Sequence, residues 1–348
     1  MTIQPGEPDD RESSVRVGVF TNIPELLRSF GVDPHAVFER AGFEVRQFSD
    51  PDRKMPYLQM TQLLAGCVEA TGCKHFGLLV GQTLSSANYG VMGAVFRVAA
   101  DVETALIGLT GHFDLHDDGG TPLFSVDPDL TLLGYTVNQP GAMAIEQIND
   151  LSIAFVFNLM RELCGAAWRP SQVLLSRRRP ADTGPYLDFF KSMPIFDAEV
   201  SAVAFPSHWL KHAVPSANEF QFRQLQLEMA EMRRLHQHEL VDLLSQHLRL
   251  GLLKGNWSAR KTAHSMGLKE HTLRRRLNAK GTSFRQQLDT VRLSLSLQLL
   301  EGTGMAVGAV AELMGYKNSS AFIRAFNRWT GTTPNEWRRE KSQKSQDR

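Results

Sequence analysis

The sequence predicts an α+β N-terminal domain followed by an all-α C-terminal domain, in which two helix-turn-helix units are joined by a long helix. Its 348 residues are enough for two domains. Residues 251–348 carry 18 Lys and Arg against 7 Asp and Glu, a net charge of +11, whereas the first 250 residues carry 20 against 30, a net charge of −10. A basic part joined to an acidic part is typical of a nucleic-acid-binding module attached to a domain that avoids phosphate.

The charge division and the hydrophobic spacing also predict the domain boundaries. We expect a disordered tail over 1–14, the α+β domain over 15–213, a linker over 214–236, the all-α domain over 237–341 and a second disordered tail over 342–348. In the linker, Leu225, Met229 and Met232 form a short apolar seam. Polar residues then interrupt the heptad spacing, so a coiled coil is not established.

Within the N-terminal domain, helical spacing and strand-like runs alternate irregularly. Apolar residues three and four apart, with prolines at two of the starts, predict helices over 23–30, 34–40, 57–70, 89–96, 102–113 and 145–164. Apolar and β-branched runs predict strands over 121–126, 130–137, 173–175 and 200–205. The first two strands flank Asp127-Pro128-Asp129, which predicts a β-hairpin.

No segment has the pattern of a signal peptide or a membrane anchor. The most apolar helix candidate, Leu151 to Met160, is about half the length needed to cross a bilayer. Cys67, Cys73 and Cys164 are odd in number and lack zinc-type spacing, which indicates reduced structural thiols, with a redox sensor as the alternative. We therefore expect a cytoplasmic protein without a membrane partner.

Two histidines invite a metal-site interpretation. His112 and His116 are four residues apart, with Asp114, Asp117 and Asp118 nearby. The run Asp-Asp-Gly-Gly that follows is more typical of a solvated turn, so a metal site is not predicted.

Other polar groups in this domain are equally weak candidates. His208 and His212 flank apolar residues, so surface or half-buried histidines are expected there. The run 177–179, three arginines, could bind a carboxylate effector, but a charged loop is favoured. No glycine-rich phosphate loop and no nucleophile elbow is found, so we predict no catalytic site and no cofactor, and the effector site stays unknown.

The stretch from Met305 to Arg338 has the pattern of a complete helix-turn-helix. Apolar spacing predicts a first helix that ends at Gly315 and a second that ends at Gly331. The second helix turns one set of residues inward: Ala321, Phe322, Ala325, Phe326 and Trp329. Thr333-Pro334 then starts a third helix with a hydroxyl cap. A buried back and a short polar front suit a helix that enters the DNA major groove, and a generic three-helix bundle is the alternative.

A second copy upstream favours DNA recognition. Ser258 to Leu277 repeats the spacing, with Ala263 and Gly267 in the places of Ala311 and Gly315. Between the copies, Ser283 to Leu300 predicts an amphipathic helix about 27 Å long. Such a helix can place the two recognition helices roughly one DNA turn, about 34 Å, apart.

These residues resemble the DNA-binding domain of the AraC/XylS family of bacterial transcription regulators. The resemblance covers about the last hundred residues and is carried by the tandem units, by Arg292 on the joining helix, and by the ending Gly315-Tyr316, Ala325-Phe326, Trp329-Thr330-Gly331, Pro334 and Trp337-Arg338. Lys269 stands where a capping serine is common, and Asn327 where a basic residue is common.

The N-terminal domain more loosely resembles the arabinose-binding-type domain of a subset of that family. The similar features are Leu26-Leu27 with Gly31, the helix after Pro56 leading to Thr71-Gly72 and Phe76-Gly77-Leu78, the segment Tyr89 to Gly93, and Pro170 with Pro180. The resemblance implies a sensing and dimerisation domain, without specifying a sugar.

Helical geometry and the resemblance together predict which residues meet DNA. Residues expected to read bases are His271, Arg274, Arg275, Ser319, Ser320, Ile323 and Arg324. Residues expected to contact phosphates are Lys261, Arg276, Lys317, Arg328 and Arg338.

The function expected is sequence-specific transcription regulation. The chain would bind double-stranded promoter DNA as a homodimer, work with RNA polymerase, and respond to a small effector bound by the N-terminal domain. Two alternatives stay open at this point, an effector-independent architectural DNA binder and an enzyme fused to a DNA-binding domain.

Overall fold

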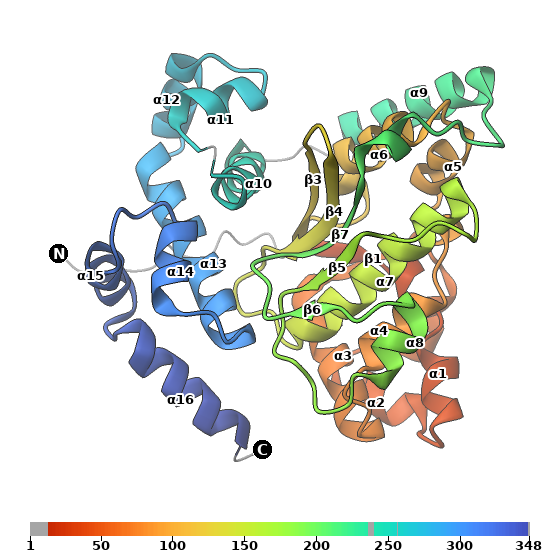
Figure 1. Ribbon diagram of the computed structural model, residues 1–348, viewed down its shortest axis with the longest axis horizontal. Coiled ribbons are helices and arrows are strands. Elements are labelled where there is room, and N and C mark those ends of the chain that lie inside the picture. The colour runs from red at the N-terminus through yellow and green to blue at the C-terminus, as the bar shows by residue number, and fades with distance from the viewer. Residues whose placement is uncertain (1–12, 236–239, 256, 347–348) are drawn as a thin grey trace. The chain divides into compact units, whose positions relative to one another are not determined.

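The computed structural model describes residues 13–235, 240–255 and 257–346 (Figure 1). The chain divides into two compact units, one over Glu12–Gln237 and the other over His238–Arg348. Most of the predicted N-terminal tail lies outside the described residues. At the other end the predicted tail 342–348 is partly helical, because the last helix continues to Gln346.

The N-terminal unit is α+β, as the sequence predicts. Its α-helices are α1 (Ile23–Ser29), α2 (Pro34–Arg40), α3 (Tyr57–Thr71), α4 (Phe76–Gln82), α5 (Val91–Val98), α6 (Val102–Gly111), α7 (Ile145–Cys164), α8 (Gly184–Phe190) and α9 (Glu219–Leu235). Its strands are β1 (Ser14–Arg16), β2 (Lys54–Pro56), β3 (Gly120–Val126), β4 (Leu130–Val137), β5 (Gln172–Leu175), β6 (Ile195–Phe196) and β7 (Ser201–Pro206). Short 3-10 turns include η3 (Ser86–Tyr89) and η4 (Phe113–Leu115).

A five-stranded sheet forms one layer of this unit, in the order β3-β4-β7-β5-β6 (Figure 1). The predicted hairpin is confirmed, with β3 and β4 antiparallel and Val126 opposite Thr131. β7 joins β4 and β5 antiparallel, and only β5 and β6 run parallel. The long helix α7 packs against β4, β5 and β7, and it also packs on α3 and α4, so it lies within the core of this unit.

Helix α4 is absent from the sequence prediction because glycines weaken its helical pattern. Those glycines serve its packing against α7. A Cβ atom at Gly77 would lie 2.0 Å from the carbonyl oxygen of Gln147, and one at Gly81 would lie 2.4 Å from that of Leu151. The two backbones therefore approach more closely than any side chain would allow.

The segment predicted as a linker, 214–236, contains helix α9. This helix packs on α5, and Met229 of the apolar seam is fully buried. The seam is therefore used within the N-terminal unit.

The C-terminal unit is all-α, as predicted. Its helices are α10 (Leu240–Leu253), α11 (Ala259–Ser265), α12 (Glu270–Ala279), α13 (Phe284–Gly302), α14 (Val307–Leu313), α15 (Ser319–Thr330) and α16 (Pro334–Gln346). The support helix α10 packs on the joining helix α13, and Leu244, Leu248 and Leu295 belong to their shared core. The structure thus confirms two helix-turn-helix units with a long helix between them (Figure 1).

Within the described ranges, no single helix combines the length and the apolar composition needed to span a bilayer; only α3 and α4 taken together meet those criteria, and they are bent by 111° at their break.

Candidate DNA-binding interface

The first helix-turn-helix unit is held together by a cap, a turn and a buried pair. The Ser258 hydroxyl accepts a hydrogen bond from the Lys261 amide at 3.2 Å and so caps α11. Gly267 adopts φ +68°, which lets the chain turn at little steric cost. Leu273 and Leu277 are buried, as predicted. Lys269 stands at the N-cap position of α12, and its side chain makes no capping hydrogen bond. A lysine there was expected to cap poorly, because a serine is common at this position in the family that the sequence resembles.

The buried pair fixes which side of α12 faces outward. His271, Arg274, Arg275 and Arg276 are exposed. The guanidinium of Arg274 lies 3.0 Å from a carboxylate oxygen of Glu270, one helical turn earlier. With 70% of the Arg274 side chain exposed, this ion pair is weak and leaves the guanidinium available to a ligand.

The second unit repeats this arrangement. The Asn318 side chain accepts a hydrogen bond from the Ala321 amide at 2.9 Å and caps α15. Phe322 and Phe326 are fully buried, so their face of the helix points into the core. On the opposite side, Ser320 and Arg324 are exposed, while Ser319 and Ile323 are half-buried.

The residues predicted to contact phosphate divide into two groups. Lys261, Arg276 and Lys317 are exposed, and Arg328 is half-exposed with its guanidinium 3.4 Å from Asp289. Arg338 is half-buried and already bonded within the unit. Its Nε donates to the Leu300 carbonyl at 3.2 Å and its Nη2 donates to the Met305 carbonyl, so it ties α16 to the last turn of α13 and to the chain that follows it. These two bonds give Arg338 a structural role, and its contact with phosphate stays a prediction.

Arg292 on α13 has a structural role that spacing alone did not reveal. Its guanidinium lies 4.4 Å from the ring centre of Trp257 and 4.8 Å from that of Tyr316. Its Nε also donates to the Met314 carbonyl at 2.9 Å. Arg292 therefore connects the joining helix to the turn of the second unit.

In the N-terminal unit, the predicted solvated turn after His116 is wrong. Asp117, Gly119 and Gly120 are buried, and the Asp117 carboxylate accepts hydrogen bonds from the amides of both glycines, at 2.7 and 3.1 Å. A side chain at Gly119 would collide with the ring of Tyr57, 2.3 Å away, so the turn is pressed against α3. Among the described residues, no three His, Cys, Asp or Glu side chains come together as metal ligands.

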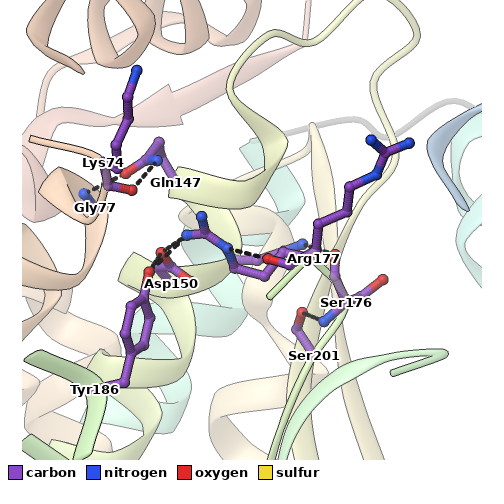
Figure 2. Close-up of polar contacts among 10 residues, drawn as sticks. Lys74, Gly77, Gln147, Asp150, Ser176, Arg177, Tyr186 and Ser201 are labelled. Atoms are coloured by element: carbon purple, nitrogen blue, oxygen red, sulfur yellow. Dashed lines mark hydrogen bonds and ion pairs between the residues drawn. The ribbon is translucent and has the colours of Figure 1, made fainter. Parts of the chain in front are cut away.

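The charged loop predicted over 177–179 is also wrong for Arg177. Its guanidinium is buried and forms an ion pair with Asp150 of α7, and the Tyr186 hydroxyl donates to the same carboxylate at 2.6 Å (Figure 2). Burial raises the pKa of Asp150 to about 7, against the lowering effects of Arg177 and Tyr186. Asp150 and Arg177 are 27 residues apart, so no local sequence signal predicts the pair.

The same view shows how α7 is fixed to its neighbours. The Gln147 amide group donates to the Lys74 carbonyl and accepts from the Gly77 amide, both at 2.9 Å (Figure 2). The thiols Cys67, Cys73 and Cys164 are unbonded to one another, and burial raises the pKa of Cys67 and of Cys164 to about 12. Such thiols are poor nucleophiles, which argues against the redox alternative at these two positions.

Comparison with known proteins agrees with both halves of this architecture. Residues 31–214 match the family model described as the arabinose-binding domain of AraC transcription regulator, N-terminal, and residues 262–340 match a helix-turn-helix domain model. The ornithine utilization regulator of Pseudomonas aeruginosa is 27% identical over 90% of this chain and 93% of its own length. The regulator VirS of Mycobacterium tuberculosis is 24% identical over 94% of this chain and 96% of its own length. The crystal structure of the regulator CdpR from Pseudomonas aeruginosa is 22% identical, covers 82% of this chain and 93% of that chain, and gives a TM-score of 0.43.

Proposed function

This chain belongs to the AraC family of DNA-binding transcription regulators, and from that premise we propose that α12 and α15 read two successive major grooves of promoter DNA. The observation that carries the proposal is the repeated geometry. Each of these helices buries one pair of apolar residues four apart and turns a short polar or basic face outward.

Within this proposal the two helices have different tasks. On α12, Arg274 and Arg275 are the base readers, because a guanidinium can bond to guanine O6 and N7 together. On α15, Ser319, Ser320 and Ile323 are short, so they select bases less strictly, and Arg324 supplies the charge. Lys261, Arg276, Lys317 and Arg328 bind phosphates and set the affinity.

Arg274→Ala is expected to weaken specific DNA binding by about 1–3 kcal/mol and to relax the preference at one or two base pairs. Arg276→Ala on the same helix is expected to weaken all sequences equally and to lower the salt slope by about one. Quantitative footprinting on the DNA upstream of the gene, at two salt concentrations and against random competitor, measures both effects.

The matched control is Arg40→Ala, an exposed arginine on α2 in the other unit, which is expected to leave the footprint unchanged. An Arg274→Ala protein that keeps the wild-type affinity and footprint would remove α12 as the reading helix. Binding that depends on salt but prefers no sequence would favour the architectural alternative.

The homodimer that we include in the proposal has a candidate surface on α9. Phe220 and Leu227 are 72% and 73% exposed, and a separation of seven residues places them on one face of the helix. Two large apolar side chains, two helical turns apart on the exposed face of α9, are suited to pairing with the same helix of a second copy.

Phe220→Glu combined with Leu227→Glu is expected to convert dimers to monomers in sedimentation velocity and to leave the circular dichroism spectrum of the folded chain unchanged, because both side chains are exposed in the single chain. The control is Gln226→Glu, which adds a charge to another face of the same helix at an exposed position and should leave the dimer intact. Dimers that persist in the double variant would place the interface elsewhere.

The N-terminal unit is, in this proposal, the sensor of a small effector. Its domain type is found ahead of the DNA-binding part in this family. Regulation follows if the effector binds differently to the DNA-competent and incompetent states of the chain. In this proposal the protein acts on promoters in the bacterial cytoplasm, and RNA polymerase is its partner there.

A further inference from the structure

A cavity of about 60 Å³ lies inside the N-terminal unit. Its walls come from α3, α6, α7, β4 and the turn η4, and they are mainly apolar. Representative wall residues are Met60, Leu64, Leu151, Phe155 and Leu159. An apolar space inside a packed core costs stability, so it is retained most readily where it binds something.

Four hydroxyl groups of the cavity wall already have hydrogen-bond partners. The Tyr57 and Tyr135 hydroxyls are 2.9 Å apart, and Tyr135 donates to the Asp117 carboxylate at 2.5 Å. The Thr61 and Thr110 hydroxyls each donate to a carbonyl of their own helix, at 2.8 Å. These groups shape the cavity and have few bonds left to offer a ligand.

His116 is the exception. It lines the cavity, is only 2% exposed, and its ring stacks on Tyr89 with 4.1 Å between ring centres. Burial lowers the pKa of His116 well below its ordinary value, with Arg16 and Lys54 acting in the same direction, so the ring is neutral. Among the buried side-chain nitrogen and oxygen atoms of the described lining residues, its Nδ1 is the one that lacks a hydrogen-bond partner. A buried, unbonded ring nitrogen is costly unless a ligand or a water satisfies it.

We propose that this cavity is the effector site, and that it takes a small, uncharged, mainly apolar molecule whose single hydroxyl or carbonyl group bonds to His116 Nδ1. The assignment rests on the proposed function, because it presupposes that the N-terminal unit senses an effector. The cavity size limits the molecule to a few non-hydrogen atoms unless the walls move apart.

Two other classes of ligand fit poorly. A sugar would bury several hydroxyls against apolar walls that cannot bond to them. A zwitterionic amino acid would bury charges, and the lone carboxylate among the described lining residues, Asp117, is already engaged by Tyr135 and two amides. A lone water is a weaker occupant than an amphiphile, since it needs two to four polar partners and leaves the apolar part of the cavity unfilled.

The packing also connects this cavity with the end of the sensing unit. Leu109 and Thr110 of its wall lie on α6, which packs on α5, and α5 packs on α9. α9 is the last described helix before the C-terminal unit. A ligand that moves α6 can therefore act on the chain leading to the DNA-binding helices through direct contacts.

The test uses the full-length protein and a matched pair of probes, 1-butanol and 1-chlorobutane, which differ in the hydroxyl group. Binding is measured by ligand-observed NMR titration. Wild-type protein is expected to bind 1-butanol about tenfold more tightly than 1-chlorobutane, the difference made by one hydrogen bond. L-arabinose and L-ornithine are expected not to bind at the same concentrations.

Substitutions then locate the site. His116→Phe keeps the ring stack but removes the nitrogen, so it should abolish the tenfold preference, whereas His208→Phe makes the same change at an exposed position and should retain it. If His116→Phe fails to fold, Ser152→Phe, which fills the cavity from α7, should abolish binding of both probes. Failure of wild-type protein to bind either probe, or an unchanged preference in His116→Phe, overturns the assignment.

Footprinting of the same protein separates this inference from the proposed function. A protein that protects its upstream DNA but binds neither probe retains DNA-binding regulation and loses the cavity assignment. His116-dependent binding of 1-butanol with an unchanged footprint retains the site and contradicts effector control of DNA binding.

Discussion

Replacing Asp150 with alanine is expected to destabilise the N-terminal unit by about 3–5 kcal/mol, because the substitution leaves the buried Arg177 guanidinium without a counter-ion. The Tyr186 hydroxyl would lose its acceptor at the same time. Loss of this magnitude is a large fraction of the stability of an ordinary domain. Hydrogen exchange of the α7 amides measures it, since these amides belong to the N-terminal unit alone.

The double variant Asp150→Leu with Arg177→Met distinguishes a charge effect from a packing effect. It removes both charges and fills much of the same volume, so it is expected to recover most of the lost stability. Asp188→Ala, at an exposed position on α8, is the control and should change stability by less than about 0.5 kcal/mol. Equal losses in the single and double variants would mean that the pair contributes through packing rather than charge.

Local signals were sufficient to predict many of the elements. Helix α2 begins at Pro34 after the Asp33 cap, and the cap and the proline are both visible in the sequence. The hairpin of β3 and β4 turns at Asp127-Pro128-Asp129, again a local signal. The helix-turn-helix units were predictable for the same reason, because glycines and inward pairs recur at fixed spacing within each of them.

Features that depend on distant contacts were not predictable. The order of the five strands depends on β7 inserting between β4 and β5, which no local pattern specifies. Helix α4 was missed because its glycines are explained only by the approach of α7. The Asp117 turn has the composition of a surface turn, and it is buried because Tyr57, 60 residues earlier in the chain, covers it.

The same distinction applies to the candidate site. The outward faces of α12 and α15 follow from helical geometry once the inward pairs are identified, so their residues could be named in advance. The structural bonds of Arg338 could not be predicted, because its acceptors, Leu300 and Met305, lie more than thirty residues earlier. His116 could not be recognised as a cavity residue, since its stacking partner Tyr89 and most of the cavity wall, such as α3 and α7, lie far from it in sequence.

Arg292→Leu is expected to destabilise the C-terminal unit by roughly 3 kcal/mol. The substitution removes two cation–π contacts, with Trp257 and Tyr316, and leaves the buried Met314 carbonyl without its donor. The matched control is Arg285→Leu on the same helix, where the arginine is exposed and little loss is expected. Hydrogen exchange of the α13 and α15 amides reports the change within this unit.

The consequence for DNA should be unequal between the two units. Met314 and Tyr316 flank the turn glycine Gly315, which leads directly into α15, whereas α12 makes none of the described contacts with Arg292. Footprinting of Arg292→Leu is therefore expected to lose protection at the part of the site read by α15 and to keep it at the part read by α12. Arg292→Lys keeps the charge but loses the planar guanidinium. Its protection of the part of the site read by α15 should be weaker than that of the wild-type protein and stronger than that of Arg292→Leu. Uniform loss along the whole site would show instead that the joining helix positions both reading helices as one rigid body.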